Sequence, residues 1–170
     1  MNRVSDIIIL RGAPGVGKTE LSKALAKHFP QGARVEVDAL RKMVISVNWT
    51  DQAEHIKMLN LAAQTVVDFA QSGFCPVIVV DTFSGDKVEG FLKRVGSLSP
   101  GFVCRVFALH VAPEVLASRL ATRPEGQFKD ACIALKLNED VLGIGHKGEV
   151  RVDTSNEPPE ALAVCIKSNL

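Results

Sequence analysis

Continuous apolar runs alternate along the chain with stretches that have the period of an α-helix. Ile7–Leu10 and Pro76–Val80 are uninterrupted and rich in β-branched residues, which is typical of strands buried on both faces of a parallel sheet. Shorter runs predict three further strands, over Arg34–Val37, Val103–Leu109 and Glu149–Val152. Strands separated by helices are joined by right-handed crossovers. The pattern therefore predicts an α/β fold, a three-layer αβα sandwich around a mostly parallel five-stranded sheet.

Amphipathic segments fill the intervals between the predicted strands. Their periodicity predicts helices over Thr19–Phe29, about 39–47, a long segment from Ile56 to Ala70, Lys87–Val95, a segment that begins at Pro113, Lys129–Val141 and Pro158–Ser168. Asp51 and Glu54 are spaced as an N-cap and its N3 partner at the start of the long helix, and Gly73 ends it. Pro124-Glu125-Gly126 interrupts the helix from Pro113. We therefore expect one domain over residues 1–170, with a short helical lid at about 120–140.

Composition and charge narrow the function classes. Apolar residues make up 46% and charged residues 23% of the chain, as in globular proteins. The net charge of +1 argues against a protein that mainly coats nucleic acid, although it allows a local basic cleft. No leader pattern and no membrane-spanning apolar segment stand out, so a cytoplasmic protein is expected. The four scattered cysteines form no CxxC pair and are expected to be small buried hydrophobes: Cys75, Cys104, Cys132 and Cys165.

A phosphate-binding pattern follows the first predicted strand. The pattern G-x-x-x-x-G-K-[ST] is matched at every fixed position by Gly12, Ala13, Pro14, Gly15, Val16, Gly17, Lys18 and Thr19. Glycines let the backbone turn several N–H groups toward one anion, and the following helix points its positive end at the same place. In such a loop Lys18 reaches the β- and γ-phosphates, and the Thr19 hydroxyl is a Mg²⁺ ligand. Because a buried strand precedes it and a helix follows it, a P-loop is favoured over a flexible turn.

Two carboxylates follow strands whose ends should lie beside this loop. Asp38 ends the second strand, where it would accept the proton of an attacking hydroxyl, while Arg41, one turn later, would hold the acceptor or its phosphate. The alternative is that Asp38 only caps a helix and Arg41 is a solvated surface residue. Asp81 ends an apolar strand and resembles a Walker B element, which would bind the Mg²⁺ shell. Asp81 could equally hold the acceptor or cap the next turn.

Three further features have candidate roles. Arg119 and Arg123 are four residues apart, so one helix face would present both as a clamp on the transferring phosphate, or as a basic helix end. Thr154 and Ser155 follow the last strand and would flank the adenine, or form an ordinary turn. Trp49, the only tryptophan, would line an acceptor pocket or pack half-buried. The histidines are assigned no role.

With these residues assembled, the chain resembles the small P-loop kinases of the group that includes chloramphenicol phosphotransferase, zeta toxins and polynucleotide 5′-kinases. The resemblance covers nearly the whole chain and rests on the P-loop, Asp38 with Arg41, the Val80-Asp81-Thr82 strand end, Arg119 with Arg123, and Val152-Asp153-Thr154-Ser155. It implies a P-loop NTPase fold, Asp38 as general base, and phosphate contacts from both arginines. Two departures are a brief lid and a minimal acceptor-binding insert between Val47 and Asp51.

These features together favour an ATP-dependent kinase that transfers the γ-phosphoryl group to a hydroxyl of a small molecule, with ATP and Mg²⁺ as cofactors. The alternatives are an ATPase or GTPase switch and a nucleotide-binding regulator without catalysis. No Asn-Lys-x-Asp guanine reader is present, which favours ATP over GTP. Nucleosides, sugars, antibiotics and 5′-hydroxyl ends remain open as acceptors, the near-neutral charge counting against the last, and the oligomeric state is also open.

Overall fold

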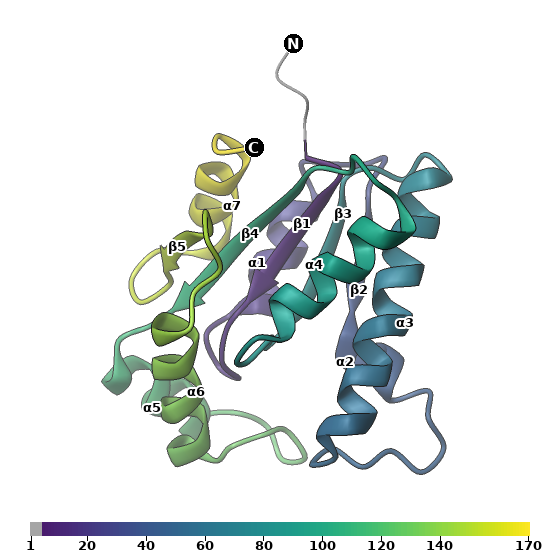
Figure 1. Cartoon of the computed structure of the whole chain (residues 1–170). Coiled ribbons are helices and arrows are strands. Elements are labelled where there is room, and N and C mark those ends of the chain that lie inside the picture. The colour runs from purple at the N-terminus through teal and green to yellow at the C-terminus, as the bar shows by residue number, and fades with distance from the viewer. Residues whose placement is uncertain (1–4) are drawn as a thin grey trace.

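A computed structural model describes residues 5–170 and contains a parallel sheet between two layers of helices (Figure 1). The strands are β1 (Ile7–Arg11), β2 (Ala33–Glu36), β3 (Val77–Asp81), β4 (Cys104–His110) and β5 (Val150–Asp153). The helices are α1 (Lys18–Ala26), α2 (Val37–Arg41), α3 (Gln52–Gln71), α4 (Lys87–Leu98), α5 (Pro113–Ala121), α6 (Ala131–Gly143) and α7 (Pro159–Lys167). The strand order is β2-β3-β1-β4-β5, and every pair is parallel. The predicted fold class is confirmed.

The central strand β1 shows why the sheet needs helices on both faces. All of its residues are buried, and successive side chains point to opposite faces. Ile7 and Ile9 belong to the core beneath α3 and α4, whereas Ile8 and Leu10 belong to the core beneath α1, α5 and α7. In Figure 1, α4 crosses one face of the sheet and α1 lies behind it. Because all strands run the same way, their carboxyl ends lie at one edge, next to the loop after β1.

Several predicted boundaries need correction. The helix expected to reach Val47 ends at Arg41, and residues 42–51 form turns, because Val44, Ile45 and Val47 are β-branched and favour helix weakly. The first helix ends at Ala26 rather than Phe29. The remaining strand and helix ends differ from the predictions by only a few residues.

The cysteine prediction is wrong for two of the four residues. Cys132 and Cys165 are exposed, because they lie on the solvent side of α6 and α7, while the other two cysteines are partly buried and all four are free. In the part of the chain that the structure describes, no helix combines the length and apolar character required to cross a bilayer.

Two buried polar side chains fix the elements around the site. Asn138 on α6 is 4% exposed, and its amide donates to the carbonyl of Val111 and accepts from the N–H of the same residue. Arg11, at the end of β1, is fully buried and pairs with Glu149 at 2.9 Å. The same guanidinium donates twice to the carbonyl of Ile144. The Asn138 contacts tie α6 to the residue after β4, and the Arg11 contacts tie the chain between α6 and β5 to the strand that leads into the P-loop.

Candidate active site

The loop between β1 and α1 has a backbone that only glycine permits at two positions. Gly15 and Gly17 have φ of 94° and 98°, in the left-handed region. A Cβ at Gly15 would lie 2.8 Å from the side chain of Leu116, and one at Gly12 would lie 2.7 Å from the carbonyl of Leu109. The loop is thus shaped by its own glycines and held against α5 and β4. Its N–H groups and the start of α1 provide an anion-binding cradle.

Lys18 folds back into this cradle. Its Nζ donates to the carbonyls of Gly12 at 2.6 Å and Ala13 at 2.9 Å. Burial lowers the pKa of the Lys18 ammonium to about 8, while the negative charges of Asp81 and Asp38 oppose that shift. The ammonium is therefore poised to exchange two carbonyl contacts for phosphate oxygens, with two carboxylates nearby. Thr19 lies exposed in the first turn of α1.

Asp38 lies in the first turn of α2, directly after β2. Although the residue as a whole is exposed, burial of its carboxyl group raises the pKa, and the negative charge of Asp81 raises it further. Lys18 and Arg41 act in the opposite direction. Because the charges of both Lys18 and Asp81 shift the pKa of Asp38, the three groups lie at the same edge of the sheet. This position and the raised pKa suit a proton acceptor.

Asp81, at the end of β3, has a partner that the sequence did not reveal. His55 on α3 places its Nε2 3.1 and 3.2 Å from the two carboxylate oxygens of Asp81, and both residues are buried. The carboxylate also accepts the N–H of Phe83 at 2.9 Å. Phe83 is fully buried with φ of 46°, an unusual conformation for a bulky residue, and its ring packs edge-on against Phe91. The turn after β3 is therefore held in one conformation around Asp81.

The periodicity of α3 contained one signal for this contact. His55 occupies a buried position of the helix, one residue after the expected N3 glutamate, so a polar ring there required a buried partner. The register that brings it to Asp81 depends on how α3 crosses the sheet, which the sequence pattern does not specify.

Arg41 is buried rather than solvated, which removes the surface alternative for this residue. It is 5% exposed, its Nη2 donates to the carbonyl of Asn48 at 3.1 Å, and its guanidinium lies 4.6 Å from the ring centroid of Trp49. A carboxylate oxygen of Glu54 lies 3.9 Å from Nη2 of Arg41. The expected capping box is formed only in part. Asp51 accepts the N–H groups of residues 53 and 54, but Glu54 accepts the N–H of Asn48 rather than that of the cap.

Arg119 and Arg123 do not share a helix face, contrary to the prediction. The helix α5 ends at Ala121, so Arg123 lies in the turn beyond it and donates to the carbonyl of Phe128. Arg119 stays on the helix, where it donates to the carbonyls of Thr154 and, at 3.4 Å, of Val16. Arg119 is therefore part of the P-loop wall. Arg123 lies close enough for its charge to lower the pKa of Lys18.

Thr154 and Ser155 brace the loops of the site. Thr154 is 4% exposed, and its hydroxyl donates to the carbonyl of Val16 at 2.7 Å. The Ser155 hydroxyl accepts the N–H of Ala112 and donates to Asp153, whose pKa is lowered by the hydrogen bonds from Ser155. The Thr154 hydroxyl therefore supports the P-loop backbone around Val16, whereas Ser155 joins the end of β5 to the residue before α5.

Two oxygen-bearing side chains, those of Thr19 and Asp81, are of the kind that a magnesium ion shared with a nucleotide would use. In residues 5–170, no cluster of three or more His, Cys, Asp or Glu residues could hold a metal by itself. Mg²⁺ usually takes one or two protein oxygens and completes its shell with water and phosphate. The Thr19 hydroxyl and the Asp81 carboxylate offer such oxygens, and His55 orients the carboxylate.

Comparisons with known proteins agree with this geometry. The family model described as AAA domain matches residues 8–140. A search of curated proteins by sequence gives no match. Among solved structures, the fold is similar to the tunicamycin resistance protein of Deinococcus radiodurans, with a TM-score of 0.72, 22% identity and coverage of 98% of this chain and 95% of that one.

Two further similar structures are kinases by name. A gluconokinase from Sinorhizobium meliloti has a TM-score of 0.67 and 22% identity, and the match covers 99% of this chain and 94% of that one. The Mycobacterium tuberculosis APS kinase CysC, in complex with AMPPNP and APS, has a TM-score of 0.64 and 12% identity, with 98% of each chain covered. At these identities the likeness concerns the fold alone. Because the family model spans most of the sequence, the chain belongs to the AAA domain family, and its fold is that of the P-loop kinases.

Proposed function

We propose that the protein is an ATP-dependent kinase that phosphorylates a hydroxyl group of a small molecule. One observation carries the proposal: Asp38, a carboxyl group with a raised pKa, lies at the same sheet edge as the P-loop lysine and is electrostatically coupled to it. A proton acceptor at that place suits transfer to a hydroxyl, whose proton is released in the reaction. The family match and the kinases of similar fold support this assignment.

In the proposed reaction the acceptor oxygen attacks the γ-phosphorus of ATP in line. The bond from the γ-phosphorus to the acceptor oxygen forms, the bond to the β,γ-bridging oxygen breaks, and ADP leaves with that electron pair. Asp38 takes the hydroxyl proton. Lys18 and the P-loop amides hold the phosphates, while Arg119 supports the P-loop wall and Arg123 approaches from the segment between α5 and α6, which we propose as the lid.

Thr19 and Asp81 would hold a Mg²⁺ ion in this proposal. When bound, the ion neutralises charge on the β- and γ-phosphates. The contribution of the chain is to keep Asp81 in one orientation through His55 and the N–H of Phe83.

The Asp38→Asn variant tests the proposal. Loss of the base should slow phosphoryl transfer by roughly 100- to 10,000-fold while Mg·ATP affinity, measured by calorimetry, stays nearly unchanged. Asp86→Asn is the matched control, because this aspartate is exposed at the start of α4 and its side chain caps nothing. Undiminished transfer by Asp38→Asn would remove the base, and ATP hydrolysis that is independent of any acceptor would favour the switch.

A further inference from the structure

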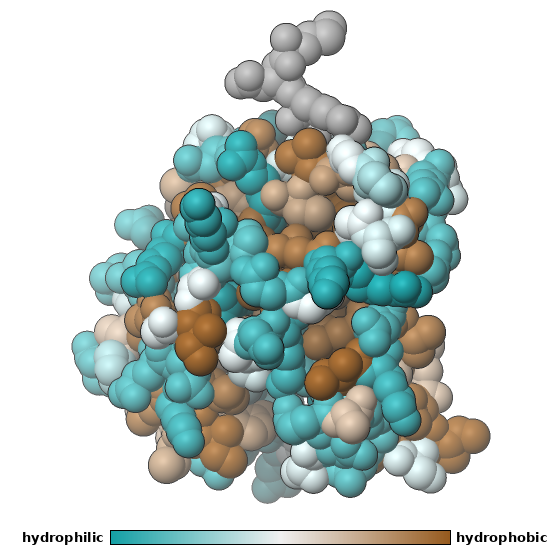
Figure 2. All heavy atoms as spheres, viewed as in Figure 1, coloured by the Kyte–Doolittle hydropathy of each residue, from teal (hydrophilic) through white to brown (hydrophobic). Residues whose placement is uncertain are grey.

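The segment between α2 and α3, residues 42–51, forms a wall after the helix that carries the proposed base and exposes apolar side chains among polar ones. Three of its large side chains are exposed: Met43 at 76%, Ile45 fully and Trp49 at 43%. In Figure 2 apolar side chains protrude at the lower right, where this segment lies in Figure 1. Large exposed apolar side chains near a candidate active site are typical of a ligand-binding surface.

Trp49 is held in place within this wall. Its ring is covered on one side by the guanidinium of Arg41, at 4.6 Å. The neighbouring turn is locked as well, since the N–H and hydroxyl of Thr50 both donate to the side chain of Asn48, and the N–H of Asn48 donates to Glu54. An aromatic ring fixed in this way binds a ligand without losing rotamer freedom. Trp49 is thus a preformed stacking surface.

Arg41 connects this surface to the proposed base. It lies one helical turn after Asp38, and its positive charge acts on the Asp38 carboxyl. Arg41 is 5% exposed, its Nη2 donates to the carbonyl of Asn48, and its buried Nε has no hydrogen-bond partner among the described residues, so the guanidinium is held against the Trp49 ring rather than offered to solvent. Arg41 therefore contributes to the site by holding the Trp49 ring in place.

We propose that the acceptor is an aromatic or otherwise flat apolar alcohol that stacks on Trp49 and directs its hydroxyl to Asp38. This inference rests on the proposed function for the phosphoryl transfer and names the class of acceptor for the same site. We expect such alcohols to be preferred over small polyols and anionic alcohols, because the exposed ring face of Trp49 offers those molecules no hydrogen-bond donor.

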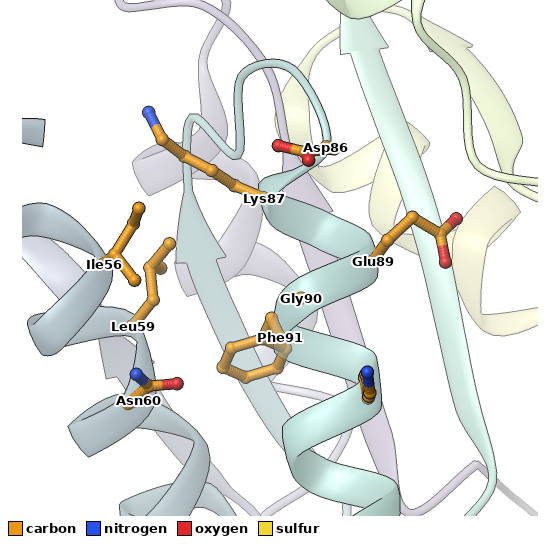
Figure 3. Close-up of a pocket in the computed structure, with 9 residues that line it drawn as sticks. Ile56, Leu59, Asn60, Asp86, Lys87, Glu89, Gly90 and Phe91 are labelled. Atoms are coloured by element: carbon orange, nitrogen blue, oxygen red, sulfur yellow. The ribbon is translucent and has the colours of Figure 1, made fainter. Parts of the chain in front are cut away.

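A groove between α3 and α4 is a second candidate for the acceptor and serves it less well. It has a volume of about 400 Å³ and lies between Ile56 and Leu59 on α3 and Phe91 on α4, with Asp86 and Lys87 at its rim (Figure 3). The Lys87 ammonium donates hydrogen bonds to the side chains of Gln52 and Ser84. Its two carboxylates, Asp86 and Glu89, are exposed and lie at the start of α4 rather than at the strand ends beside the P-loop.

The single tryptophan gives a direct test, because the chain has no tyrosine and its fluorescence reports on Trp49 alone. Titration with 2-phenylethanol and 3-phenylpropanol, in the presence of Mg·AMPPNP, should change the fluorescence with a Kd roughly tenfold or more below that of glycerol or glycerol 3-phosphate. Equal or tighter binding of glycerol or glycerol 3-phosphate would overturn the proposal.

Variants separate the stacking surface from the fold. In coupled assays of phosphoryl transfer, Trp49→Ala should raise KM for the aryl alcohols roughly tenfold, Trp49→Phe should retain most of the affinity, and Arg41→Lys should fall between them. Phe74→Ala, at an exposed aromatic residue before β3, is the control and should leave KM unchanged. An unchanged KM in Trp49→Ala would refute the acceptor class.

Failure of this inference is distinguishable from failure of the kinase assignment. Efficient transfer to glycerol, lost in Asp38→Asn, would leave the kinase standing and remove the aromatic acceptor. Fluorescence changes with aryl alcohols that occur without any transfer would support the stacking surface and remove the kinase.

Discussion

The two halves of the site are built by different means. The phosphate half is made of backbone: glycines with positive φ, the start of α1, and a lysine bonded to carbonyls of its own loop only five and six residues away. The half that would hold the metal and the acceptor is made of side chains from separate elements, such as the contact between His55 and Asp81, which are 26 residues apart. A local motif can fix the first half, whereas the second depends on how α2 and α3 pack on the sheet. Substitutions should therefore act locally in the first half and through packing in the second.

Loss of the lysine should have the largest effect and test the phosphate half. Lys18→Ala should reduce phosphoryl transfer by roughly 100- to 1,000-fold and weaken Mg·ATP binding, because a charge that balances the phosphates is gone. The fold should not be destabilised, since burial already disfavours the charged form of Lys18. Calorimetry measures the Mg·ATP affinity and thermal unfolding measures the stability. Lys23→Ala, at an exposed lysine on the same helix, is the control. A lower Tm in Lys18→Ala would show that the loop depends on the lysine for its structure.

Removal of His55 should disturb the metal and acceptor half by lowering stability. His55→Ala leaves the buried Asp81 carboxylate without its imidazole partner, which should lower the free energy of unfolding by about 1–3 kcal/mol. Urea denaturation measures the loss. Adding Asp81→Asn should recover part of it, because the unpaired charge is then absent. Equal loss in the single and double variants would mean that the ring contributes by packing alone.

A methyl group in the P-loop should test how local the phosphate half is. In Gly15→Ala the new Cβ would meet Leu116 at 2.8 Å with φ of 94°, so the unfolding free energy should fall by about 1–3 kcal/mol. Gly96→Ala in α4 is the matched control: no atom lies within 4 Å of its Cβ position. This control should gain about 0.5–1 kcal/mol from helix propensity. A neutral Gly15→Ala would show that α5 yields to the loop.

The pH profile should show that the two halves are coupled electrostatically. For kcat/KM we expect a bell, rising with pH as Asp38 loses its proton above the usual carboxyl range and falling as Lys18 loses its charge near pH 8. Asp81→Asn should move both limbs to lower pH, because the charge of Asp81 raises the pKa of Asp38 and of Lys18. Steady-state rates from pH 4 to 10 measure the limbs. Limbs that stay in place would show that Asp81 does not act on either group.

The free energy of unfolding should depend on pH through the pKa shifts of Lys18 and Asp38, which act with opposite signs. An unfolded lysine keeps its proton to about pH 10.5, so the free energy of unfolding should rise as pH increases from about 8 toward that value. The raised pKa of Asp38 acts the other way, because the folded carboxyl group holds its proton longer than the unfolded one. Its contribution is therefore lost as the pH rises from 3.8 through the raised pKa.

The sequence by itself determined the sheet, the loop and the edge of the site. Apolar runs such as Ile7–Leu10 specify buried strands because both of their faces must be covered, and the spacing of Gly12, Gly15, Gly17 and Lys18 specifies a backbone shape within a few residues. Parallel strands then force the ends of β2 and β3 to the edge of that loop, which is why Asp38 and Asp81 could be singled out.

Only the tertiary structure decided which side chains meet at that edge. The burial of Arg41 against Trp49, the pairing of His55 with Asp81 and the separation of Arg119 from Arg123 depend on helix ends and on how the helices cross the sheet. A helix that ends two residues earlier than its pattern suggests moves a side chain from one face to a turn, as in the case of Arg123 beyond Ala121. Local periodicity carries no information on such long-range contacts, because they are selected by the packing free energy of the whole fold.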